Sequence, residues 1–251
     1  MTGLIYKEFR QNKLFIISCI FVPFIPLIYY VLFCAFTQRK SLIEVLGYLY
    51  STDGQTAYIF LIIAGLAITA ALQQKIFKCD ESRKWALFIA TSSEGIKGFL
   101  YVKYILVFVM GLLYIFSMEL LDSVLSTVYT ICTNNPAVSV TSTIAMPMFY
   151  FEIFLISIDL LLIIRFGSRT AEYVKLILCI ILAIAVVMLV NMWPLQITDF
   201  LIYVKNALLS GNGRNIILIK GIQPFACIFA YVVSYYISCK IYLKGVNQYG
   251  Q

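Results

Sequence analysis

The residues of this chain that are best suited to chemistry lie in one polar segment between two apolar stretches. The segment contains Asp80, Glu81, Ser82, Arg83, Lys84 and Trp85, then Thr91 and Glu94, then Lys97 and Lys103. Both signs of charge beside an aromatic ring suit binding to a charged protein surface. The chain has no histidine, so the usual histidine partner of a nucleophilic serine or cysteine is missing. We therefore expect a contact surface here and no catalytic residues.

Cysteine and glycine spacing argues against metal and nucleotide sites. Seven cysteines are scattered without a C-x-x-C pair, so the chain lacks the usual zinc and copper constellations. No glycine is followed by lysine, although a Walker A loop needs that pair to hold phosphate. We predict no metal, no cofactor in this chain and no enzyme activity. A bridge between Cys34 and Cys132 is an alternative to the favoured interpretation, in which cysteines pack as small hydrophobic residues.

Composition places the chain in a membrane. Hydrophobic residues make up 62% of 251 positions and charged residues 12%, which leaves too little polar surface for a water-soluble fold. The apolar runs are continuous, which favours helices over a barrel. Each is long enough for a bilayer of about 30 Å, which needs roughly 20 helical residues. The predicted spans are 14–36, 57–77, 104–121, 144–164, 174–193 and 221–243. We expect a single all-α transmembrane domain over 1–251.

The distribution of cations predicts the orientation. Fourteen of the 19 lysines and arginines fall on one side of the predicted spans, and the other five are Arg39, Lys40, Lys205, Arg214 and Lys220. By the positive-inside rule both termini face the cytosol. The net charge of +7 then reflects topology and anionic headgroups, so it does not indicate nucleic-acid binding.

Two helices are expected at the cytosolic surface. Residues 1–13 form an amphipathic candidate, with Thr2 as a cap, Ile5 and Phe9 on one face and Lys7 among the residues that meet headgroups. A simple positive anchor is an equal alternative for this segment. A second short helix begins at Ser82, and Thr91 and Glu94 have the spacing of a capping box that starts the third span. That polar loop could transmit a push or serve only as a solvated connector.

The polar segment resembles the signature loop of small bacterial ABC-2-type permeases. The similarity rests on Asp80 to Ala86, Thr91, Glu94 to Gly98 and Lys103-Tyr104, and on the opening Gly3 to Phe9. Within that superfamily the chain is most similar to permeases of phenol-soluble-modulin exporters and their clostridial relatives. The likeness extends over the length and the six spans. The family usually has proline shortly after the threonine, whereas this chain has Ser93.

The resemblance implies the membrane subunit of an exporter in the bacterial cell membrane. A separate ATP-binding subunit would hold ATP and magnesium, and a second permease chain, identical or related, would complete the pathway. The loop 78–98 would be the coupling helix. Its implied contact residues are Asp80, Glu81, Arg83, Lys84, Trp85, Glu94 and Lys97. The implied cargo is an amphipathic or hydrophobic peptide.

Acids within the apolar spans are the remaining candidates, since an ionised group in lipid is costly. Glu152 and Asp159 lie seven residues apart and hence on nearly one helix face, and Glu119 and Asp122 lie near the outer end of the third span. All four are translocation-path candidates. The alternative is structural, with Asp159 paired to Arg165 or Arg169, or Glu152 protonated and hydrogen-bonded.

Three other functions stay open at this point. An immunity permease would expel an attacking antimicrobial peptide with the same architecture. A secondary transporter would use Glu152 and Asp159 to carry protons or cations. A membrane scaffold or sensor would transport nothing.

Overall fold

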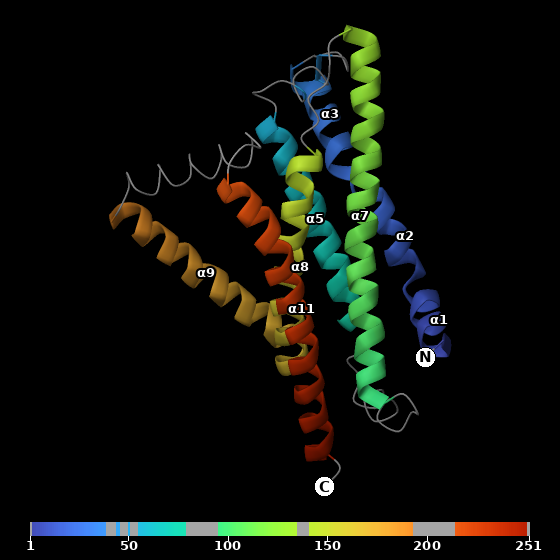
Figure 1. The fold of residues 1–251 in the computed structure, drawn as a ribbon, viewed down its shortest axis with the longest axis vertical. Helices are drawn as coiled ribbons and strands as arrows, with labels where there is room; N and C mark the ends of the chain where they lie inside the picture. Colours follow the sequence, from blue (N-terminus) through green and yellow to red (C-terminus); the bar gives the residue numbers. More distant parts are fainter. Residues whose placement is uncertain are drawn as a thin grey trace. The chain divides into compact units, whose positions relative to one another are not determined.

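The described part of this chain is helical throughout. The structure is a computed structural model that describes residues 2–38, 44–45, 50, 55–78, 95–134, 141–192 and 214–249. Its helices are α1 (Thr2–Gln11), α2 (Lys13–Phe21), α3 (Phe24–Gln38), α5 (Gln55–Lys78), α7 (Gly95–Thr133), α8 (Thr141–Phe166), α9 (Ser168–Met192) and α11 (Arg214–Tyr249) (Figure 1). Within these ranges no strand occurs, so the expected all-α class is confirmed.

Several helices are long and apolar enough to cross a bilayer. In the described ranges these are Ile59–Phe77, Gly95–Thr133, Ala145–Phe166 and Gly221–Tyr242, with Lys13–Phe21 and Phe24–Cys34 together as a bent fifth. The chain is therefore a multi-pass membrane protein. The predicted span 174–193 falls largely on α9, but α9 is not among these candidates, so the number six stays a prediction.

The first predicted span is broken rather than continuous. Residues 14–36 fall on α2 and α3, which meet at a bend of 40°. Pro26 has no N–H to donate to the carbonyl of Val22, and that carbonyl instead accepts from Ile25 at 3.2 Å. Loss of one regular hydrogen bond beside Pro23 explains why the helix bends here.

The third predicted span is the middle of a much longer helix. α7 has 39 residues, about 58 Å at 1.5 Å per residue, whereas a bilayer core is about 30 Å thick. The helix ends at Asn134, whose φ of 54° is left-handed and whose N–H donates to the carbonyl of Thr130 at 2.9 Å. The predicted span 104–121 lies within this helix, and its bounds in the membrane stay a prediction.

The chain divides into two compact units. Unit 1 comprises Met1–Ile76 and Tyr101–Ile153, and unit 2 comprises Phe77–Leu100 and Phe154–Gln251. Both α7 and α8 contribute to each unit. The expected single domain over 1–251 stays a prediction, and each unit is described by itself.

Two glycines in unit 1 leave room for aromatic side chains of neighbouring helices to pack against the helix backbone. A Cβ at Gly65 on α5 would lie 2.8 Å from ring carbons of Tyr114, and one at Gly111 on α7 would lie 2.7 Å from Phe149. Tyr114 crosses to α5, where its hydroxyl donates to the carbonyl of Ile62 at 3.0 Å. Such small-residue contacts are typical of close helix packing in membranes.

In unit 2 a single residue joins α8 to α9. Gly167 has a φ of 79°, a conformation that glycine adopts without a steric penalty. Its N–H donates to Ile163 and its carbonyl accepts from Ala171, both at 2.9 Å. α11 is tied to α8 by the Ser234 hydroxyl, which donates to the carbonyl of Ser157 at 2.7 Å.

Candidate functional site

The predicted coupling residues lie mostly outside the described ranges. Asp80, Glu81, Arg83, Lys84, Trp85 and Glu94 all fall within 79–94, between the end of α5 and the start of α7. Of the predicted set, Lys97 alone is described. It is exposed in the first turn of α7, and its carbonyl accepts from the hydroxyl of Tyr235 on α11 at 3.1 Å. The described residues closest to this segment in the sequence are therefore those at the end of α5 and at the start of α7.

In unit 1 the end of α5 is held against α7 by a buried lysine. Lys103 is 1% exposed, and its Nζ donates to the carbonyl of Ile76 at 2.5 Å. That carbonyl is among the last four of α5, which have no partner within the helix. The ammonium group also complements the negative end of the helix dipole. Gln73 adds a second link, because its Nε2 donates to the carbonyl of Val107 at 2.9 Å.

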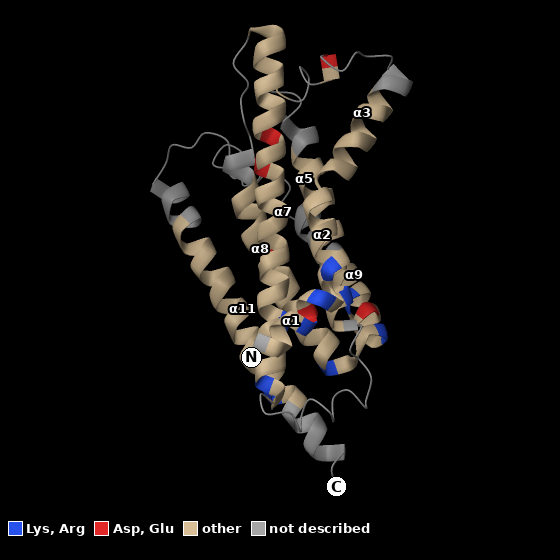
Figure 2. Cartoon of the chain, turned by 90° about the vertical axis from the view of Figure 1, so that its right-hand side faces the viewer, with Lys and Arg blue, Asp and Glu red and all other residues tan. Residues whose placement is uncertain are grey.

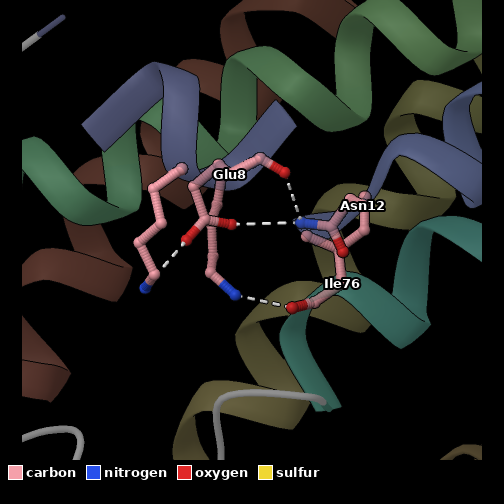
Figure 3. Close-up of polar contacts among 5 residues, drawn as sticks. Glu8, Asn12 and Ile76 are labelled. Carbon is pink, nitrogen blue, oxygen red and sulfur yellow. Dashed lines mark hydrogen bonds and ion pairs between the residues drawn. The ribbon is translucent and has the colours of Figure 1, made fainter. Parts of the chain in front are cut away.

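The N-terminal helix α1 buries polar side chains at the same place. Glu8 is fully buried and Asn12 is 2% exposed. Asn12 Nδ2 donates to the carboxylate of Glu8 at 3.2 Å and to its carbonyl at 3.0 Å. Figure 3 shows this pair beside the carbonyl of Ile76, and Lys7 Nζ lies 3.7 Å from the other carboxylate oxygen. We call the buried set Glu8, Asn12, Lys103 and Ile76 the polar junction.

Sequence reasoning missed the polar junction. The amphipathic pattern drew attention to Ile5 and Phe9, which are 38% and 41% exposed in the folded chain. The inward face of α1 is instead polar. The available signal was Glu8 and Asn12 at i and i+4, a spacing that places two hydrogen-bonding side chains on one face.

Charges in unit 1 gather around the polar junction. Lys7, Arg10 and Lys13 lie on or beside α1, and Lys75 Nζ stands 5.9 Å from the ring centroid of Phe15 on α2. Figure 2 shows lysines and arginines in blue near α1 and red residues further along α7. The red positions on α7 are Glu119 and Asp122.

The two acids predicted at the outer end of the third span differ from one another. Asp122 is 4% exposed, and its Oδ1 accepts a hydrogen bond from the hydroxyl of Tyr50 at 3.0 Å. Glu119 is partly exposed. Asp122 is therefore enclosed within unit 1, and the assignment of both acids to a translocation path stays a prediction.

The acid on α8 in unit 1 is enclosed. Glu152 is 6% exposed, and within the described ranges neither carboxylate oxygen has a hydrogen-bond partner. Glu152 follows Phe149 by one helical turn, on the side of α8 where Phe149 meets Gly111 of α7. The side chain is shielded from lipid and from water by the protein itself.

The acid on α8 in unit 2 has a cation partner. Asp159 Oδ2 lies 2.6 Å from Nζ of Lys175 on α9, with side chains 14% and 45% exposed. The sequence suggested Arg165 or Arg169 as partners, and both are exposed. The partner is Lys175 because the chain reverses at Gly167 and brings α9 alongside α8.

Cysteines show no bridge in the described ranges. Cys34 and Cys132 are both free thiols there, as are Cys19, Cys179, Cys227 and Cys239. Within the same residues no cluster of three potential ligands could hold a metal ion.

Comparison with known proteins gives no match. No protein-family model matches the chain, and no curated protein or solved structure is similar enough to count as a match.

Proposed function

We propose that this protein is the permease subunit of an ATP-driven ABC-2-type exporter of amphipathic or hydrophobic peptides in a bacterial cell membrane. The proposal rests on two features: the resemblance of the segment 78–98 to the ABC-2 signature loop, and the contacts between α5 and α7, the helices that flank this segment. The single observation that carries it is the hydrogen bond from Lys103 to Ile76, which fastens together the two helices that the segment connects.

Mechanical coupling follows from that fastening. A displacement of residues 79–94 would reach α5 through Lys78 and α7 through Gly95. Because Lys103 and Gln73 tie α5 to α7, the two helices would move as one body. Packed helices that move as rigid bodies are a common means of switching access.

The polar junction adds α1 to this moving body. Separation of α1 from the end of α5 would expose Glu8 and Asn12 and would remove the contact that now buries them. α1 therefore acts as a brace along the inner leaflet. This role gives a physical reason for a polar inward face on a helix with apolar residues exposed.

Cation placement supports cytosolic termini in a six-span arrangement. In unit 1, Lys7 and Arg10 lie on α1, Lys13 begins α2 and Lys75 lies in the last turn of α5. In unit 2, Arg165, Arg169 and Lys175 flank the corner at Gly167. Each group lies where the proposed topology places a cytosolic end, as the positive-inside rule requires.

ATP with magnesium would be held by a partner subunit, and a second permease chain would complete the path. The proposed contact residues for the ATP-binding subunit are Asp80, Glu81, Arg83, Lys84, Trp85, Glu94 and Lys97. Opposite charges on a partner surface would steer docking and fix its register.

Charge reversal tests this contact. The double variant Arg83→Glu/Lys84→Glu is expressed with its ATP-binding partner, and co-purification and peptide-stimulated ATP hydrolysis are measured. We expect both to be lost. The matched control is Arg39→Glu/Lys40→Glu, which makes the same charge change on the proposed outer side and should preserve both.

Retention of both activities in Arg83→Glu/Lys84→Glu would overturn the assignment of the contact. Transport by the purified chain in vesicles without any ATP-binding subunit would overturn the ATP-driven mechanism itself.

A secondary transporter is the second candidate, and the buried Glu152 favours it. Unpaired acids inside a membrane commonly mark proton or ion pathways. In that case peptide or ion flux would follow an imposed proton gradient in vesicles that contain this chain alone, and the Arg83→Glu/Lys84→Glu variant would transport normally.

A further inference from the structure

In the part of unit 1 that the structure describes, Glu152 has no cationic partner. The carboxyl group is enclosed, and within the described ranges it takes part in no hydrogen bond and no ion pair. This differs from an acid that lines a water-filled path, which would be hydrated and accessible.

Neighbouring helices offer two titratable groups to Glu152, and neither is a cation. Tyr114 on α7 and Cys19 on α2 both interact electrostatically with its carboxyl group. The hydroxyl of Tyr114 already donates its proton to the carbonyl of Ile62. Cys19 is fully buried and offers only a weak S–H donor. The local donors cannot replace the water that an ionised carboxylate would lose.

The free energy of burial differs between the ionised and the protonated forms of Glu152. An ionised carboxylate buried without a partner costs several kcal/mol, and such groups bind a proton instead. A neutral acid in the same place leaves only unsatisfied neutral oxygens, which cost about 1–3 kcal/mol. The enclosure therefore accommodates the acid form.

We propose that Glu152 is a proton-binding site, occupied by one proton at neutral pH while the contact between α7 and α8 in unit 1 is closed. The ligand is a proton, because the carboxyl group is enclosed and, within the described ranges, neither of its oxygens has a hydrogen-bond partner. Proton exchange then requires that this contact opens.

This inference goes beyond the exporter proposal and does not depend on it. A permease driven by ATP and a secondary transporter would both contain the same protonated group. The test uses the purified chain in lipid nanodiscs with no ATP-binding subunit, so its failure is distinct from failure of the proposed function.

Infrared difference spectroscopy at neutral pH provides the test. Subtraction of the Glu152→Gln spectrum from the wild-type spectrum should leave a carboxylic acid C=O band and no carboxylate bands. The matched control on the same helix is Asp159→Asn. Because Asp159 is ion-paired with Lys175, its subtraction should leave carboxylate bands and no acid band.

A chemical probe supplies an independent readout on the wild-type chain. Dicyclohexylcarbodiimide reacts with protonated carboxyl groups in apolar surroundings and forms a stable N-acylurea that keeps all atoms of both reactants. It would reach Glu152 during the same opening of the α7–α8 contact that proton exchange requires. Peptide mass spectrometry should find the adduct on Glu152 and not on Asp159. The adduct should be lost in Glu152→Gln.

Carboxylate bands in the Glu152→Gln subtraction would overturn the proposal, as would the absence of an adduct on Glu152, whether or not Asp159 is labelled. If Glu152→Gln does not fold, the labelling pattern of the wild-type chain decides alone.

Discussion

Two acids on one helix, Glu152 in unit 1 and Asp159 in unit 2, have opposite surroundings. Glu152 is enclosed without a partner in the described part of the chain, whereas Asp159 is partly exposed and 2.6 Å from Lys175. Their spacing of seven residues places them on nearly the same face of α8. A shared face therefore does not give a shared environment, because different helices cover successive turns.

The difference teaches what each acid can do. Asp159 is neutralised by a fixed cation and closes the corner between α8 and α9. Glu152 can be neutralised only by something that it binds. A bound proton is thus a role for Glu152 and not for Asp159, and the translocation-path assignment of both acids stays a prediction.

The largest effect is expected from a substitution that opens the enclosure of Glu152 and so removes the difference between the two acids. Gly65→Val places a side chain where ring carbons of Tyr114 would lie 2.8 Å from its Cβ. Overpacking should lower the free energy of unfolding by about 2–3 kcal/mol. The measurement is thermal unfolding in detergent, together with the acid band of Glu152, which should weaken as Tyr114 is displaced.

The control for this substitution is Gly221→Ala, because a Cβ at Gly221 meets nothing within 4 Å. Alanine in a helix is favoured over glycine by up to about 1 kcal/mol. Equal stability of Gly65→Val and wild type would show that α5 and α7 are less closely packed than described.

A smaller effect, of opposite sign, is expected from Glu152→Met. Methionine has a similar length and no oxygen that needs a partner, so the free energy of unfolding should stay equal or rise by about 1 kcal/mol. Thermal unfolding of the variant beside wild type measures it. A loss of stability would indicate that Glu152 has a partner that stabilises the fold.

The smallest change in stability is expected from substitutions at Asp159 and at its partner. Asp159→Asn and Lys175→Met should each lower stability by less than about 1 kcal/mol, because Lys175 is 45% exposed and exposed pairs contribute little. A double-mutant cycle should give a coupling energy that shrinks with added salt. A large coupling energy that does not depend on salt would show that Asp159, like Glu152, is shielded from solvent, and would contradict the contrast between the two acids.

Helix type and approximate position could be predicted from the sequence, because the apolar runs are long and continuous. The bend in the first span could also have been inferred from Pro23 and Pro26, but hydrophobicity alone does not register a missing N–H. The start of α7 at Gly95 lies next to the Thr91 and Glu94 capping box, whereas its extension to Thr133 does not follow from the apolar run alone.

The polar contacts depended on tertiary structure and could not be predicted. Glu8 meets Asn12 within its own helix, but its burial depends on α1 lying against the end of α5 in unit 1. The pairing of Asp159 with Lys175 depends on the reversal at Gly167. Arg165 and Arg169 are nearer in sequence to Asp159, but their side chains are exposed. The contact residues predicted within 79–94 stay predictions.

The single-residue corner at Gly167 constrains how this sequence can evolve. Each residue added or removed there would rotate everything beyond it by about 100° around the axis of α9, carrying Lys175 away from Asp159. Substitutions in α8 and α9 can therefore accumulate one at a time, but insertions and deletions between the two helices should be rare among natural variants.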